Sequence, residues 1–142
     1  MNAYVSAALL GAGSGMRASV APFASRWKRT GRFPLRNALA LAGELAADKM
    51  PFAGPRTALP ALVARAGAAG IATRCLPAGS RLTRVGLAGT AAASAVACAF
   101  AMMRARKELV ERSGLADAAV AVVEDALALA VVIAATRANG KA

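Results

Sequence analysis

The sequence predicts an all-α protein that is embedded in a membrane, and three observations support this. The chain has 142 residues, of which 58% are apolar and only 4% aromatic. Its apolar residues form long runs instead of the interleaved pattern of a soluble domain. No charged residue occurs from Val85 to Met103, a stretch that as a helix is about 28 Å long, close to the hydrocarbon thickness of a bilayer. We therefore expect a polytopic integral membrane helical bundle of four or five membrane elements, forming one domain over residues 1–142.

Five helices are expected in order along the chain. They are Ala3–Trp27, Leu35–Met50, Thr57–Cys75, Thr83–Lys107 and Leu115–Arg137. Pro51 and Pro55 separate the second helix from the third, and Pro77 with Gly79 ends the third. The second helix is short and carries four charged residues, so it either spans the membrane or returns to the same side as a re-entrant element.

The N-terminal segment is uncharged up to Met16 and lacks the basic start of a signal peptide. We therefore expect it to be retained as a membrane helix. Small residues recur at a spacing of four on this helix, and the fourth helix offers a similar small-residue surface, which predicts close helix–helix packing. The two stripes are Ala7, Gly11, Gly15 and Ser19, and Gly86, Gly89, Ala93 and Ala97.

The net charge of +11 raises the question of nucleic-acid binding. The cations lie in short clusters between apolar runs, a placement typical of topology signals and lipid-headgroup contacts, so membrane lipids and not nucleic acid are the expected partners. The same placement predicts that the loop from Arg26 to Arg36 is cytoplasmic. Cys75 and Cys98 lie in apolar sequence, and the chain has no histidine. We therefore expect packing cysteines, no metal site and no cofactor.

An internal repeat is suggested at an offset of eighty residues. "PLRNALALAGELA", from Pro34 to Ala46, aligns with "GLADAAVAVVEDA", from Gly114 to Ala126, and places Glu44 on Glu124. The repeat halves would be residues 1–50 and 83–137, linked by the helix over 57–75. Such halves would form an inverted repeat of two helical hairpins, as in many transporters. The alternative is a bundle without symmetry.

Charged residues fall near the middle of several predicted helices. Insertion of an ionisable group costs roughly 2.5–3.5 kcal/mol, so such groups are kept where they pair, contact water or serve a function. Two hypotheses follow: an ion or proton site at the repeat interface, or buried salt bridges that fix the bundle. The candidate ligand- or ion-binding residues are Arg17, Glu44, Asp48, Lys49, Arg56, Arg65, Glu124 and Asp125.

Four motifs resemble those of a family of small, uncharacterised bacterial multi-pass membrane proteins classed as a domain of unknown function. They are "GSGMRASVAPF" (Gly13 to Phe23), "GELAADKMP" (Gly43 to Pro51), "PRT" (Pro55 to Thr57) and "VAVVEDALAL" (Val120 to Leu129). The chain departs from the family pattern at Pro55, where serine is expected, and before Arg104, where Gly-Tyr is expected. The resemblance implies a bacterial cytoplasmic membrane location and the residues above, but no activity.

Taken together, these patterns predict a small-solute or ion transporter or channel that forms a homo-oligomer. The alternative is a non-catalytic membrane scaffold or assembly protein whose buried charges are structural. An enzyme is not expected, because the sequence offers neither a nucleophile with a nearby base nor a metal-ligand cluster. The sequence does not identify the solute.

Overall fold

The computed structural model describes residues 1–47, 58–113 and 117–138. These residues form six α-helices and one 3₁₀ turn, and contain no strand. The elements are α1 (Ala3–Met16), α2 (Val20–Thr30), α3 (Leu35–Ala47), α4 (Leu59–Ala72), η1 (Thr73–Cys75), α5 (Arg81–Ser113) and α6 (Asp117–Arg137). The all-α prediction is confirmed for this part of the chain.

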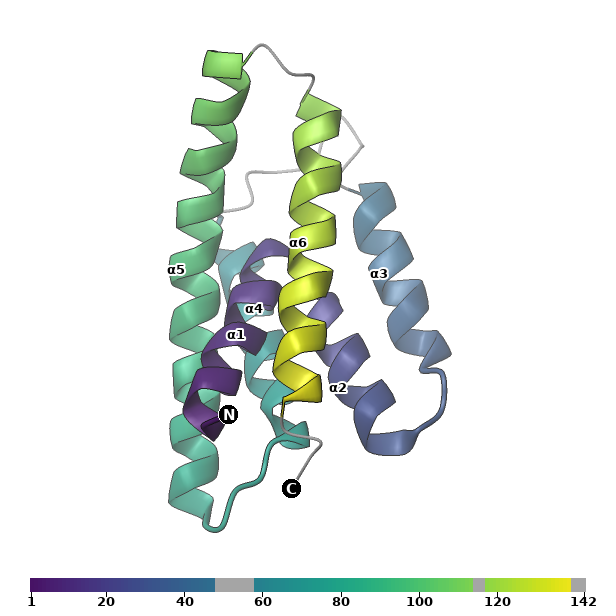
Figure 1. The fold of residues 1–142 in the computed structure, drawn as a ribbon, viewed down its shortest axis with the longest axis vertical. Helices are drawn as coiled ribbons and strands as arrows, with labels where there is room; N and C mark the ends of the chain where they lie inside the picture. Colours follow the sequence, from purple (N-terminus) through teal and green to yellow (C-terminus); the bar gives the residue numbers. More distant parts are fainter. Residues whose placement is uncertain (48–57, 114–116, 139–142) are drawn as a thin grey trace.

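The predicted single helix from Ala3 to Trp27 is wrong, because the chain breaks and reverses between α1 and α2. Arg17 is extended, with φ −141° and ψ 115°. In Figure 1, α1 rises from the N-terminus and α2 descends again, so both outer ends lie at the same end of the molecule. The α1–α2 pair is therefore a helical hairpin. Neither helix has the length of roughly 20 residues that a spanning helix needs.

Pro22 accounts for the position of this break. A proline has no N–H to donate to the residue four positions earlier, and its ring collides with that carbonyl in a continuous helix. For Pro22 the affected carbonyl is that of Ala18. In the first turn of a new helix the same proline is tolerated, and α2 begins at Val20. At its other end α2 stops at Gly31, whose φ of 64° is the left-handed conformation of a helix C-cap.

The remaining predicted helices are present with shifted ends. α5 is longer than predicted and reaches Ser113, whereas α4 is shorter and continues as η1. α3 begins at Leu35 as predicted, and its predicted last turn lies outside the described residues. In the part of the chain that the structure describes, two helices are long and apolar enough to cross a membrane, Arg81–Arg112 and Ala119–Arg137. The count of four or five membrane elements therefore remains a prediction.

The core lies where α1 packs against α5, α4 and α6. The close approach to α5 uses the predicted small-residue stripe on α1: a Cβ added to Gly11 would collide with the backbone of Ala91, and one added to Gly15 with that of Ala95. Ser94 Oγ also donates to the Ala8 carbonyl at 2.7 Å. The stripe on α1 is thus a packing surface, as predicted.

The packed face of α5 is not the predicted stripe. Its buried residues are Leu87, Ala91, Ala95 and Ala99. Gly89, Ala93 and Ala97 of the predicted stripe are exposed on the single chain. Since Ala91 and Ala95 face Gly11 and Gly15, the partner of the glycine stripe is a stripe of alanines two positions along the helix.

Candidate functional site

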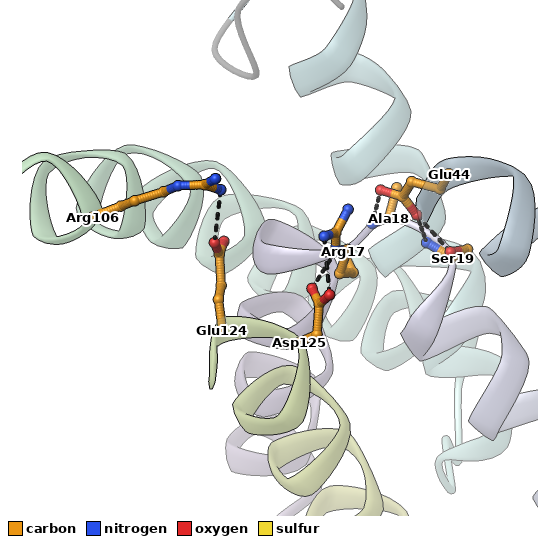
Figure 2. Close-up of polar contacts among 7 residues, drawn as sticks. All are labelled: Arg17, Ala18, Ser19, Glu44, Arg106, Glu124 and Asp125. Atoms are coloured by element: carbon orange, nitrogen blue, oxygen red, sulfur yellow. Dashed lines mark hydrogen bonds and ion pairs between the residues drawn. The ribbon is translucent and has the colours of Figure 1, made fainter. Parts of the chain in front are cut away.

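The break between α1 and α2 is the place where the first carboxylate, the half-buried Glu44, binds. Glu44 of α3 accepts hydrogen bonds from the backbone N–H groups of Ala18 and Ser19, at 2.9 and 3.0 Å. The Ser19 hydroxyl donates to the same carboxylate (Figure 2). The first N–H groups of a helix have no partner within it and carry a partial positive charge. Glu44 therefore caps α2 from a different helix.

The second carboxylate pairs with the arginine at the break. Arg17 is 3% exposed, and its Nε and Nη2 donate to the two carboxylate oxygens of Asp125 on α6, the latter at 3.1 Å. Figure 2 shows the two planar groups facing each other. A two-bond contact between arginine and carboxylate is the strong form of this ion pair. It ties the apex of the hairpin to α6.

The third carboxylate, Glu124, pairs with Arg106 of α5. The Arg106 Nη1 lies 3.5 Å from Glu124 Oε2, and Glu124 is 4% exposed. Arg106 is not among the predicted site residues, and the predicted helix ends one residue later, at Lys107. α5 instead continues to Ser113, which places Arg106 on its side, facing α6. No local pattern in the sequence indicated this pairing, because it depends on how α5 and α6 pack against each other.

Arg65 of α4 lies between two cavities and is 6% exposed. One cavity has a volume of about 460 Å³ and contains Gly15, Arg106 and Glu124 in its wall. The other has a volume of about 440 Å³ and contains Ser19 and Glu44. Arg65 contributes to both walls. The two cavities thus share Arg65, and Glu124 and Glu111 line the first while Glu44 lines the second.

The predicted site residues are therefore only partly brought together. The structure places Arg17, Glu44, Arg65, Glu124 and Asp125 around the hairpin apex and the two cavities. Within the described residues, Glu44 and Glu124 have separate partners and do not bond to each other. The other three candidates, Asp48, Lys49 and Arg56, lie outside the described residues. The groups that sequence reasoning missed are the Ala18 and Ser19 donors and Arg106.

No family model, curated protein or solved structure matches this chain. The family resemblance drawn from the motifs accordingly stays a prediction, and the function must be argued from the geometry of this chain.

Proposed function

We propose that the protein is an integral membrane transporter or channel that moves an ion or a small polar solute past Glu44, Arg65 and Glu124. The observation that carries the proposal is the position of Arg65 in the walls of two cavities, each holding one of these carboxylates. A polar path needs charged groups that contact open volume, because charges sealed in a core can only hold the structure together. The protein would be a multi-pass, oligomeric component of the bacterial cytoplasmic membrane.

The surface of the two long helices supports a membrane location. Only 22% and 28% of their apolar windows are buried in the chain, although a core helix of a soluble protein would be mostly covered. Large apolar side chains of α6, among them Val122 at 68% and Val123 at 67% exposure, face outward. In water such a surface would be costly, whereas lipid solvates it.

The interrupted α1–α2 hairpin supports a binding step. Broken membrane helices present N–H groups to anionic groups in many transporters, and Glu44 occupies that position here as an anion supplied by the protein itself. Protonation of Glu44, or competition by another anion for the Ala18 and Ser19 donors, would release the carboxylate toward the cavity that it lines. Such a release is the conformational step that the proposal requires.

The test is flux through the purified protein in liposomes. Proton movement is followed with an entrapped pH dye, and potassium and chloride movement with ion-selective electrodes. We expect flux of at least one of these ions in the unchanged protein. Glu44→Gln and Glu124→Gln should each lower it at least tenfold, because the amide removes the charge while keeping the size.

Glu108→Gln is the matched control. Glu108 is an exposed glutamate of α5, paired with Arg112 one turn away at 3.9 Å, and lines neither of the two cavities. Its substitution should leave flux unchanged. Equal flux in all four proteins, or no flux above that of empty liposomes for any of the three ions, would overturn this assignment for these ions.

A membrane scaffold is the second candidate, and the ion pairs favour it. Arg17 with Asp125 and Arg106 with Glu124 each join two helices. If these charges are only structural, the glutamine variants will melt at lower temperature, and the unchanged protein will carry no ion. Measuring thermal unfolding and flux on the same preparations separates the two candidates.

A further inference from the structure

The end of the molecule where α2 meets η1 carries a cluster of arginines around a small pocket. Arg26 and Arg29 lie three residues apart on one face of α2, and Arg74 is in η1. Together with Ser25, Asn37 and Cys75, they line a cavity of about 110 Å³. The wall thus combines three guanidinium groups with a hydroxyl and an amide. All of these are hydrogen-bond donors.

The positive charge of this pocket is not balanced by nearby acids. The sequence contains no Asp or Glu in residues 1–43 or 49–107. Among the residues that the structure describes, none of the three arginines has an ion-pair partner. Arginines held together without a counter-charge repel one another. An anion in the pocket would remove that repulsion.

Lys28, which neighbours Arg29 in α2, adds a further positive charge near the pocket. Lys28 Nζ is buried and, within the described part of the chain, has no hydrogen-bond partner. Burial raises the pKa of the Cys75 thiol, while the charges of Lys28 and Arg29 act in the opposite direction. Both cations therefore lie close enough to influence a group in the pocket wall. Cys75 is a free, half-buried thiol and offers a chemical reporter of the pocket.

Arg26 also belongs to a wider hollow of about 480 Å³, with Arg32, Phe33 and Arg36 in its wall. Beside it, Phe23, Trp27 and Phe33 form a cluster of edge-to-face rings with centroids 5.6–5.8 Å apart. Trp27 and Phe33 are 47% and 60% exposed. Exposed aromatic rings beside basic residues are typical of the headgroup level of a membrane.

We propose that Arg26, Arg29 and Arg74 form a binding site for a single phosphate group. Arginine binds phosphate oxygens with two parallel hydrogen bonds and is weakly hydrated, so three arginines around a small cavity select a phosphate over a less charged anion. The group belongs either to an anionic phospholipid or to free phosphate. Basic pockets between membrane helices bind lipid headgroups of this kind on the cytoplasmic side, where the basic loop is predicted to lie.

The experiment follows the reaction of Cys75 with the neutral reagent N-ethylmaleimide in a Cys98→Ala background. The protein is placed in phosphatidylcholine nanodiscs, in nanodiscs with 30% phosphatidylglycerol (about one lipid in three), and in phosphatidylcholine nanodiscs with inorganic phosphate. Occupancy covers the thiol and raises its pKa further, so modification should slow at least fivefold. Slowing by phosphatidylglycerol alone identifies the lipid as the source, and slowing by inorganic phosphate identifies the free anion.

The triple variant Arg26→Gln, Arg29→Gln and Arg74→Gln should lose this protection, and Arg74→Gln alone should weaken it if the triple variant does not fold. The control is Arg84→Gln, an exposed arginine of α5 outside the pocket. This variant experiences the same surface charge of the nanodisc, and its Cys75 should stay protected. Equal modification rates in all three media, or protection that survives in the arginine variants, would overturn the proposal.

Discussion

At the predicted repeat offset of eighty, residues 1–33 correspond to residues 81–113, yet the first stretch forms a broken hairpin and the second one continuous helix (Figure 1). The break at Arg17–Ser19 corresponds to residues 97–99 in the middle of α5. Pro22 corresponds to Met102, and the glycines and serine before Arg17 correspond mostly to alanines. One proline, together with the glycines and serine that precede Arg17, therefore decides whether this length of chain forms one straight helix or reverses its direction.

The two aligned glutamates show the same contrast. Glu44 binds backbone donors that exist only because a helix ends there, whereas Glu124 binds the side chain of Arg106 on a helix that does not end. A carboxylate at a broken helix can be replaced by another anion, since the donors are part of the fold. Glu124, by contrast, pairs with the side chain of Arg106. The two glutamates therefore differ in the kind of group that binds them, and the following variants test this difference between the hairpin and α5.

The largest effect is expected from filling the contact between the hairpin and α5. Gly15→Leu puts a side chain where even a Cβ would collide with the Ala95 backbone, so the cost should exceed about 3 kcal/mol, the usual upper range for overpacking. Thermal unfolding in detergent should show loss of the folded form. Gly89→Leu is the control, because a Cβ there meets nothing within 4 Å. Equal melting of the two variants would contradict the packing of α1 on α5.

The next variant transfers the break to the other helix. Met102→Pro should cost about 3 kcal/mol, since α5 loses one hydrogen bond and collides at the carbonyl of Cys98. Pro22→Ala, at the aligned position, should change stability by less than about 1 kcal/mol, because Glu44 already satisfies the end of α2. Helicity and melting temperature are measured for both. If Met102→Pro lowers the free energy of unfolding only slightly, Glu124 caps the broken helix as Glu44 caps α2.

The smallest effect is expected at the cap itself. Glu44→Gln keeps one acceptor but points an amide group at N–H donors, so the free energy of unfolding should fall by about 1–2 kcal/mol, the usual range for a lost cap. Denaturant titration in detergent measures this change. Glu108→Gln, in an exposed pair of α5, should change it by less than about 0.5 kcal/mol. A larger loss at Glu108 than at Glu44 would contradict the capping role.

Composition and periodicity predicted the helices well, because long apolar runs and prolines act locally. They also identified Arg17, Arg65 and Glu124 as groups to be explained, and all three are buried. The reversal at Arg17 was missed although Pro22 signals it, since a proline within an apolar run can also mark a kink. The choice of Asp125 for Arg17 and of Arg106 for Glu124 depends on how helices distant in sequence pack, which no local pattern records.

The bidentate contact at the hairpin apex joins residues 108 positions apart in the chain. The pairing of Arg17 with Asp125 forms only when α6 packs beside the hairpin, so it is not a local contact of α1 and α2. Loss of α6 would leave the Arg17 guanidinium at the hairpin apex without this carboxylate, which makes the position of the hairpin dependent on the C-terminal helix.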